Sequence, residues 1–224
     1  MKFGMKLTLF DLDNTLLSGD SDYAWAQFLI EQGVLDRDIY EKANDAFYAS
    51  YKAGTLNIHE FLAFQLRPLS QYSREQLDAW HAQFMDGKIR PMITTAARKL
   101  VDDHLDAGDV CVIITATNSF VTTPIARELK IPHLIATEPE IRNGAFTGGT
   151  FGTPCFREGK IERLDAWLRD YGTPLSKFEA SRFYSDSLND LPLLERVTHP
   201  VAVDPDDTLR RVAEERGWPT LSLR

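Results

Sequence analysis

The chain has 224 residues, of which 43% are hydrophobic and 26% are charged, and its formal net charge is −8 at pH 7. This composition is that of a folded globular protein and excludes a disordered, collagen-like or low-complexity chain. The negative charge disfavours nucleic acids and anionic membranes as partners, because no cluster of Lys or Arg offsets it.

The first apolar run, Leu7 to Phe10, ends abruptly at Asp11. An unbroken run of this kind predicts a buried strand of a parallel sheet. The run is too short for the hydrophobic part of a signal peptide and for a membrane span. The two cysteines, Cys111 and Cys155, are too few for a disulfide framework and indicate a reducing compartment. We therefore expect a cytoplasmic protein.

Residues 18–88 contain amphipathic helical patterns and no strand-like run, and they are rich in aromatic and acidic residues. A stretch of this length is too long for a loop inside a compact domain. We therefore expect a helical cap domain at residues 18–88, inserted into a catalytic core that is formed by residues 1–17 and 89–224.

Strand-like and helical runs alternate through the rest of the chain. Strands are predicted at Val110–Ile114, His133–Ala136, Arg182–Tyr184 and Pro200–Val203. Helices are predicted near Ile93–Leu105, with Pro91 close to the start, and at Val121–Leu129, Ile161–Leu168 and Leu209–Glu215. The Asn143-Gly144 pair predicts a tight hairpin. This alternation predicts an α/β fold with a parallel sheet and right-handed crossovers.

Polar residues stand where the predicted strands end, which is the edge at which open parallel sheets bind ligands. Asp11 and Asp13 follow the first strand and Thr115 ends the second, whereas Lys160 begins a helix. Asp186 and Asp190 follow a later strand. Several carboxylates that meet in one crevice repel each other unless a cation binds between them. Hard oxygen ligands suit Mg²⁺.

These residues also form a recognisable set of motifs. The stretch Asp11-Leu12-Asp13-Asn14-Thr15 resembles motif I (DxDxT) of the haloacid dehalogenase (HAD) superfamily of phosphohydrolases. Thr115 resembles motif II, Lys160 motif III, and Ser185–Asp190 motif IV. The motifs occur in order over the whole core, and the insert lies where the family has its C1 cap. We identify the sequence as a member of subfamily IB, in the branch that contains phosphoserine phosphatase.

The resemblance implies a Rossmann-like HAD fold and a Mg²⁺-dependent phosphomonoesterase that works through an aspartyl-phosphate intermediate. Asp11 is then the nucleophile, and Asp13 is the general acid and base. The resemblance also implies that the Asp11 carboxylate, the Asp13 backbone carbonyl and Asp186 bind Mg²⁺. The phosphoryl oxygens are expected to bind to Thr115, Ala116, Lys160 and Asn189, and Asp190 is expected to position metal-bound water or Lys160.

Two motifs depart from the form that phosphoserine phosphatases have. Their motif II reads Ser-Gly-Gly, whereas this chain has Thr115-Ala116-Thr117-Asn118, and Ser185 replaces the glycine of motif IV. These differences leave the phosphatase chemistry intact and place only the phosphoserine substrate in question.

The insert gives the remaining evidence on the substrate. Asp20 and Asp22 are candidates to bind an amine, and Arg67 is a candidate to bind a carboxylate. Because the insert has only Arg37, Arg67 and Arg74 against an excess of acids, we expect a leaving group with cationic or ring character and no carboxylate. Histidinol phosphate fits this description, with phosphoserine and sugar or nucleotide phosphates as alternatives.

Two other classes of function share some of these features. A phospho-acceptor signalling module also has an aspartate at a strand end and Mg²⁺, but the long insert favours an enzyme with an enclosed site. A non-catalytic ligand-binding relative is disfavoured because both motif I aspartates are present. We expect a small phosphomonoester as the partner, and a monomer or homodimer.

Overall fold

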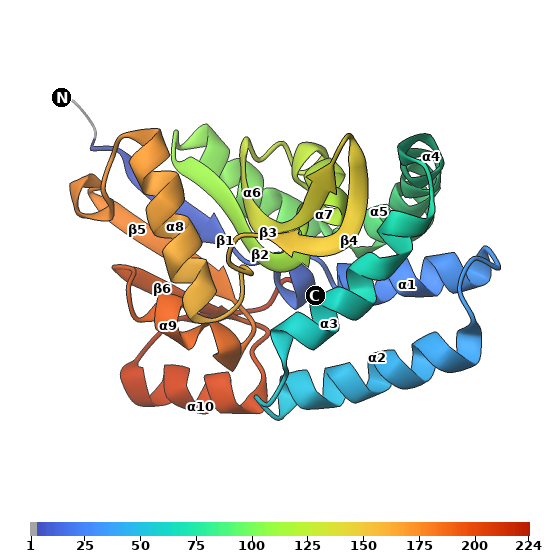
Figure 1. The fold of residues 1–224 in the computed structure, drawn as a ribbon. Coiled ribbons are helices and arrows are strands. Elements are labelled where there is room, and N and C mark those ends of the chain that lie inside the picture. Colours follow the sequence, from blue (N-terminus) through green and yellow to red (C-terminus); the bar gives the residue numbers. More distant parts are fainter. Residues whose placement is uncertain (1–3) are drawn as a thin grey trace.

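The computed structural model describes residues 4–224, so the first three residues of the charged N-terminal segment lie outside it. The described residues form a seven-stranded sheet with the order β4-β3-β2-β1-β5-β6-β7 (Figure 1). The strands are β1 (Lys6–Phe10), β2 (Val110–Asn118), β3 (His133–Arg142), β4 (Ala145–Phe151), β5 (Ala180–Ser185), β6 (His199–Val203) and β7 (Thr220–Leu221). All neighbouring strands are parallel except β3 and β4, which form the predicted antiparallel hairpin.

Helices cover both faces of the sheet. Leu7 and Leu9 of β1 contribute to a hydrophobic cluster on one face, and Phe10 contributes to the cluster on the other face. This alternation follows from the two-residue period of a strand. One face packs against α8 (Glu158–Tyr171), α9 (Leu191–Leu194) and α10 (Asp207–Arg216). The other packs against α6 (Thr95–Asp106) and α7 (Ser119–Glu128).

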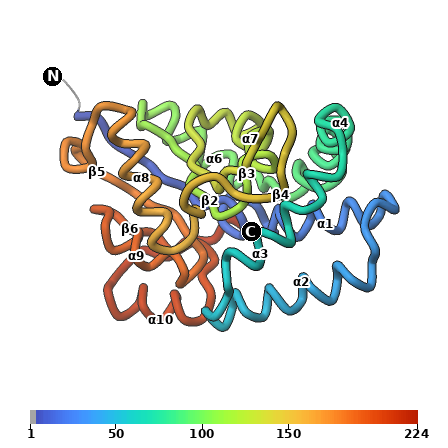
Figure 2. Tube along the Cα trace, in the orientation of Figure 1, coloured from blue at the N-terminus to red at the C-terminus, as the bar shows by residue number. Residues whose placement is uncertain are grey.

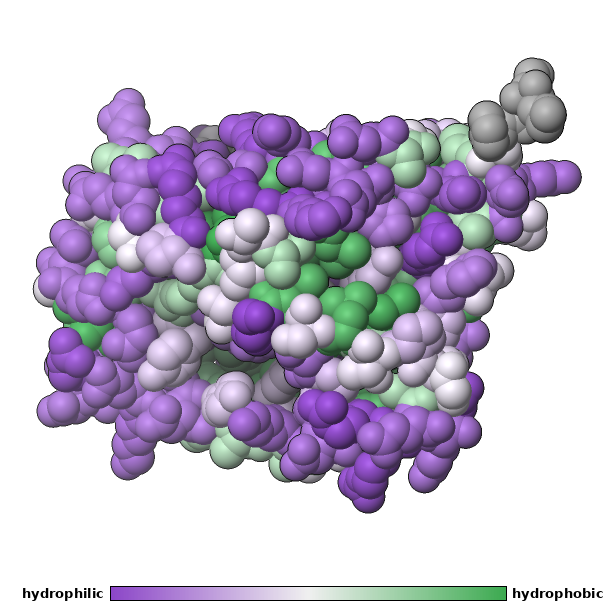
Figure 3. Space-filling model, turned by 180° about the vertical axis from the view of Figure 1, so that it is seen from behind, coloured by the Kyte–Doolittle hydropathy of each residue, from purple (hydrophilic) through white to green (hydrophobic). Residues whose placement is uncertain are grey.

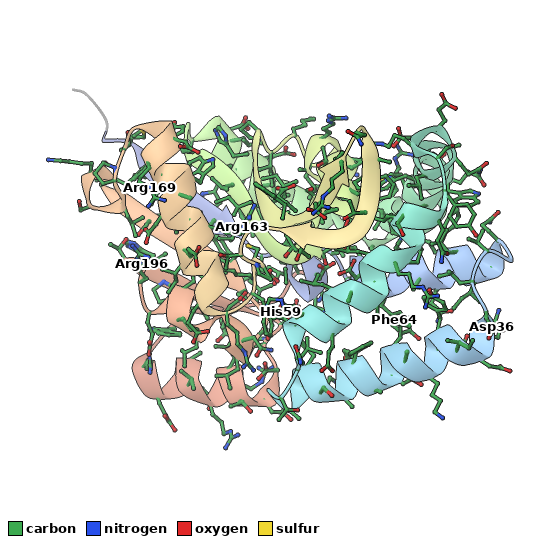
Figure 4. All side chains as sticks on the ribbon, in the orientation of Figure 1. Asp36, His59, Phe64, Arg163, Arg169 and Arg196 are labelled. Carbon is green, nitrogen blue, oxygen red and sulfur yellow. The ribbon has the colours of Figure 1, made fainter. Side chains whose placement is uncertain are left out.

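The insert is helical, and it lies beside the sheet (Figures 1 and 2). Its helices are α1 (Ser21–Glu31), α2 (Arg37–Lys52), α3 (Ile58–Leu66) and α4 (Arg74–Phe84), and the short α5 (Arg90–Met92) follows. Phe64 of α3 lies on the side that faces α2 (Figure 4), where its ring centroid is 4.6 Å from that of Tyr40. The arm formed by α2 and α3 thus has apolar packing of its own.

The insert and the core also share a hydrophobic cluster. The cluster that contains Phe10 of β1 continues through Leu16 into Trp25 of α1 and Phe84 of α4. The ring centroids of Trp25 and Phe84 lie 5.1 Å apart, and Phe84 is fully buried. Buried apolar area of this kind is lost if either part moves away, so the two parts stabilise each other.

One helix begins later than the sequence predicts, and one short strand was not predicted. Helix α6 begins at Thr95 rather than near Pro91, because the Thr94 side chain caps it by accepting a hydrogen bond from the Ala97 amide at 3.0 Å. Ile93 lies before this helix and instead pairs with Leu17 in an isolated β-bridge. The short strand β7 was not predicted, because two residues carry no periodic pattern.

The surface is mixed in hydropathy, in agreement with a chain that is 43% hydrophobic and 26% charged. The face seen in Figure 3 is hydrophilic around its edge, and hydrophobic residues reach the surface near its centre. Among residues 4–224, none of the helices combines the length and the apolarity that a membrane span requires.

The shared cluster predicts that the insert and the core unfold together. Phe84→Ala should lower the free energy of unfolding by about 3–5 kcal/mol, because it leaves a cavity in a packed cluster. Two tryptophans, Trp25 and Trp80, lie in the insert, and two, Trp167 and Trp218, lie in the core. When the two tryptophans of one part are replaced with Phe, the fluorescence of the remaining two reports the unfolding of the other part during denaturation with urea. We expect coincident midpoints, and two separate transitions would contradict a shared core.

Candidate active site

The segment after β1 turns sharply and places two aspartates at the edge of the sheet. Asp13 has an extended backbone, whereas Asn14 has a φ of 56°, in the left-handed region that Asn tolerates better than most residues. The turn is closed by the Leu17 amide, which donates to the Leu12 carbonyl at 2.9 Å. As a result, the side chains of Asp11 and Asp13 both line a single cavity at the carboxyl ends of the strands.

Asp11 is paired with a buried lysine. The Lys160 ammonium of α8 donates to Asp11 Oδ1 at 2.8 Å and to Asp190 Oδ2 at 2.7 Å. Only 3% of the Lys160 side chain is exposed. Ser185 Oγ donates to the same Asp190 oxygen at 2.7 Å. A cation in this position needs both carboxylates to offset the loss of its hydration.

In the described part of the chain, the hydrogen-bond donors around Asp13 are all uncharged. Thr117 Oγ1 donates to Asp13 Oδ2 at 2.7 Å, and the Ser21 amide at the start of α1 donates to Asp13 Oδ1 at 2.6 Å. Thr115 Oγ1 lies farther from Asp13 Oδ2, at 3.4 Å. The two motif I aspartates therefore have different environments, one set by a cation and the other by hydroxyl and amide groups.

Asp186 lies beside Asp11, and a threonine links them. Thr15 Oγ1 is 3.1 Å from Asp186 Oδ1 and 3.4 Å from Asp11 Oδ2, and it accepts a hydrogen bond from the Asp186 amide at 3.1 Å. No group of three or more His, Cys, Asp or Glu side chains in residues 4–224 is placed to hold a metal ion. Two carboxylates together with a backbone carbonyl and water would still suit a hard cation such as Mg²⁺.

Burial and mutual repulsion raise the pKa values of these carboxyls. Burial raises the pKa of Asp11 to about 7 despite the opposing charge of Lys160, and Asp190 adds to the rise. The pKa of Asp13 rises to about 6, also mainly through burial. Burial and the charges of Asp11 and Asp190 raise the pKa of Asp186 well above its usual range. Within residues 4–224 the carboxylates thus outnumber Lys160, the cation that contacts them, which is an arrangement that a bound divalent cation would relieve.

The cavity brings together most of the residues predicted from the motifs. Its walls also include the apolar side chains of Leu56, Ile58, Phe61 and Phe156. The predicted residues that line it are Asp11, Asp13, Asp20, Thr115, Ala116, Lys160, Asn189 and Asp190. Asp186 lines the neighbouring cleft instead.

Two of the predicted substrate-binding residues lie elsewhere. Asp22 is buried; its Oδ1 accepts a hydrogen bond from Asn118 Nδ2 at 3.2 Å and its Oδ2 lies 3.2 Å from Thr117 Oγ1, and it lines none of the cavities described here. Arg67 is exposed in the turn after α3 and also lies outside the cavity. The expectation that these two residues bind an amine and a carboxylate of the substrate therefore does not fit the geometry. Asp22 instead positions Thr117, which binds Asp13.

Several residues of the site were not predicted. Tyr51 of α2 lines the cavity, and its hydroxyl donates to Ser187 Oγ at 2.9 Å. Arg157 donates to Asn189 Oδ1 at 2.9 Å and to the Gly54 carbonyl at 2.6 Å, which joins the core to the insert. Thr117 could have been predicted from the sequence. It lies two residues after Thr115 on the same strand, and residues two apart on a strand lie on the same face.

Comparison with known proteins places this geometry in a family. The family model of haloacid dehalogenase-like hydrolases matches residues 8–195. A histidinol-phosphatase of Neisseria meningitidis serogroup C (strain 8013) is 46% identical over 97% of this chain and 99% of its own length. A phosphoserine phosphatase of Mycobacterium tuberculosis (strain ATCC 25618 / H37Rv) is 32% identical over 96% of this chain and 70% of its own. The crystal structure of a protein of unknown function from Bordetella pertussis Tohama I has a TM-score of 0.94 and 48% identity, and it covers 99% of this chain and 100% of that one.

The raised pKa values predict that the metal-free protein loses stability as the pH rises. A carboxyl whose pKa in the folded state exceeds the unfolded value of 3.8 binds its proton more tightly when folded. Its stabilising contribution is complete below the unfolded pKa and is lost as the pH rises through the folded pKa. With values of about 7 for Asp11 and about 6 for Asp13, the Tm in a chelator should fall by several degrees from about pH 5 to about pH 7.5.

Thermal unfolding followed by circular dichroism measures this fall. Asp22→Asn should reduce it, because burial raises the pKa of Asp22 well above its usual range and the amide does not titrate. Asp36→Asn is the matched control, since Asp36 is exposed and Asn also caps α2. A Tm that rises steadily over this pH interval would exclude the assignment of raised pKa values.

Proposed function

Because the chain belongs to the haloacid dehalogenase-like hydrolases, we propose that it is a Mg²⁺-dependent phosphatase that hydrolyses histidinol phosphate through a phosphorylated Asp11. The observation that carries the choice of substrate is the 46% identity with a histidinol-phosphatase over nearly the whole length of both chains. The cavity supports it independently, because an aspartate lines it together with apolar and aromatic side chains, and no arginine does.

The residues around Asp11 suit a magnesium ion. We assign its ligands to the carboxylates of Asp11 and Asp186 and to the backbone carbonyl of Asp13. When bound, the ion neutralises charge on the phosphoryl group and on the crowded carboxylates. Lys160 provides a second positive charge, and together with Thr115 and the Ala116 amide it is placed to bind the phosphoryl oxygens. These charges allow a phosphate dianion to approach a chain with a net charge of −8.

Asp11 and Asp13 divide the reaction between them. In the first step an Asp11 oxygen attacks phosphorus, the bond from phosphorus to the substrate oxygen breaks, and Asp13 gives its proton to that leaving oxygen. In the second step Asp13 takes a proton from water, whose oxygen attacks phosphorus and releases phosphate from Asp11. A pKa of about 6 for Asp13 suits both roles near neutral pH. Lys160 favours the ionised form of Asp11 that the attack requires.

The leaving group of the substrate faces the insert. We assign residues 18–88 to the cap and residues 1–17 and 89–224 to the catalytic core, because all the catalytic residues lie in the core while Asp20, Tyr51, Leu56, Ile58 and Phe61 of the insert close the cavity. Asp20 is the acidic residue of the insert that lines this cavity, so it is the partner for a substrate amine.

Phosphoserine is the second candidate. It also carries an amine that Asp20 would bind, and the relative that is 32% identical is a phosphoserine phosphatase. Its carboxylate, however, has no arginine to pair with in the cavity, because Arg67 is exposed outside it. A buried carboxylate without a cationic partner would be costly to bind. The geometry therefore favours a substrate in which the group that accompanies the phosphate and the amine is uncharged.

Loss of the nucleophile should abolish turnover. Asp11→Asn keeps the shape of the side chain but cannot form the phosphorylated intermediate, so kcat should fall by about 10³-fold or more. Hydrolysis of 4-nitrophenyl phosphate with Mg²⁺ and with EDTA measures this loss together with the need for the metal. Asp36→Asn, the same change at an exposed site, should keep full activity. Activity of Asp11→Asn above a few per cent of the wild type would rule out the covalent mechanism.

The role of Asp20 predicts a specific loss of amine recognition. The wild type should prefer histidinol phosphate to 3-(imidazol-4-yl)propyl phosphate, which lacks only the amine, and to phosphoserine. In Asp20→Asn the ratio of kcat/KM between the first two substrates should fall by about 10- to 100-fold, because the amine loses its charged partner. Steady-state kinetics with the three substrates measures these ratios. A wild-type preference for phosphoserine would overturn the choice of substrate.

A further inference from the structure

A second chamber adjoins the catalytic cavity on the side of the insert. Asp20, Tyr51, Leu56 and Phe61 line both the catalytic cavity and this second chamber, and we take the space between these four residues as the passage from one to the other. The chamber extends between α2 and α3, where Asn44 and Gln65 lie in its wall. A substrate with its phosphoryl group at Asp11 would extend its leaving group past Asp20 toward α2 and α3.

Asn44 and Gln65 form a buried amide pair in the wall of this chamber. Asn44 is 3% exposed and Gln65 is 8% exposed. Gln65 Nε2 donates to Asn44 Oδ1 at 3.1 Å, which fixes the Asn44 side chain. Asn44 Nδ2 is buried and has no hydrogen-bond partner within residues 4–224. A buried donor without an acceptor is unfavourable, and it marks a position where a bound molecule can supply the acceptor.

The other residues that line the chamber indicate the chemical character of the molecule that would bind there. The lining residues include the aromatic side chains of Phe47, Tyr48 and Phe61, and they include no Lys, Arg or His. Flat rings pack well against such walls. Asp20 is the charged residue of the chamber, and it lies at the passage. The far end therefore suits an uncharged ring that carries a hydrogen-bond acceptor, and it disfavours a carboxylate.

We propose that Asn44, held in place by Gln65, binds the unprotonated ring nitrogen of an imidazole leaving group and thereby determines substrate specificity. This inference rests on the proposed function and extends it to the recognition of the ring. The order of groups along histidinol phosphate matches the order of the site: the phosphoryl group lies at Asp11, the amine at Asp20 in the passage, and the ring at Asn44. Neutral imidazole carries one nitrogen that accepts a hydrogen bond.

The test compares substrates that differ only in the ring. Phenylalaninol phosphate keeps the phosphate, the amine and an aromatic ring but lacks the ring nitrogens. The wild type should prefer histidinol phosphate to it by about 10- to 100-fold in kcat/KM, mainly through KM. Asn44→Leu and Gln65→Leu should bring this ratio close to one. Gln83→Leu is the matched control, because Gln83 lies exposed on α4, and it should keep the wild-type ratio.

The outcomes separate this inference from the proposed function. If the wild type hydrolyses histidinol phosphate well and phenylalaninol phosphate equally well, ring recognition by Asn44 is refuted while the proposed function stands. If the wild type prefers phosphoserine to both, the proposed function fails and the inference fails with it. The comparison of the two substrates with the wild type does not depend on whether any variant folds. Circular dichroism of each variant shows whether its ratio of kcat/KM values was measured on a folded protein. A variant ratio unchanged from the wild type also refutes the role of Asn44.

Discussion

One buried cation organises the catalytic edge of this protein. Lys160 lies between Asp11, which follows β1, and Asp190, which follows β5, at 2.8 and 2.7 Å. Removing Lys160 would cost about 3–5 kcal/mol, because Asp11 and Asp190 would remain buried with neither water nor a counter-ion. The first turn of α8 is therefore held against two adjacent strand ends. The same interaction keeps a positive charge where we propose that the phosphoryl group binds.

The position of Lys160 also gives the two motif I aspartates different surroundings, which bears on the different roles that we propose for them. Lys160 contacts Asp11 and not Asp13, whose oxygens accept hydrogen bonds from Thr117 and the Ser21 amide. Lys160 opposes the rise in the pKa of Asp11 that burial causes, but the pKa still reaches about 7, so a bound divalent cation would be needed to keep Asp11 ionised for the proposed attack on phosphorus. Burial with neutral donors favours a carboxyl that gains and loses a proton near neutral pH. The backbone reversal at Asn14 holds both side chains in one cavity without giving them the same partners.

The positions of the site residues could be predicted from the sequence more completely in the core than in the insert. The strand ends of a parallel sheet meet at one edge, so Asp11, Thr115 and Asp190 could be brought together from the position of each strand alone. No such rule places side chains between packed helices. Asp20 and Asp22 were equivalent candidates, yet the first lines the cavity and the second is buried against Thr117. Which side of α1 faces the core depends on the shared hydrophobic cluster, which involves residues far apart in the sequence.

Closure of the site depends on contacts between the end of α2 and the motif IV loop. The Tyr51 hydroxyl donates to Ser187, and the Asn189 amide is held between Arg157 and the Tyr51 carbonyl, which accepts from Asn189 Nδ2 at 3.4 Å. Arg157 has a φ of 51° and also reaches the Gly54 carbonyl, so the core holds a strained residue where it contacts the insert. Because Asn189 lines the cavity and also belongs to this junction, the proposed binding of the phosphoryl group and the enclosure of the leaving group would be coupled through one side chain.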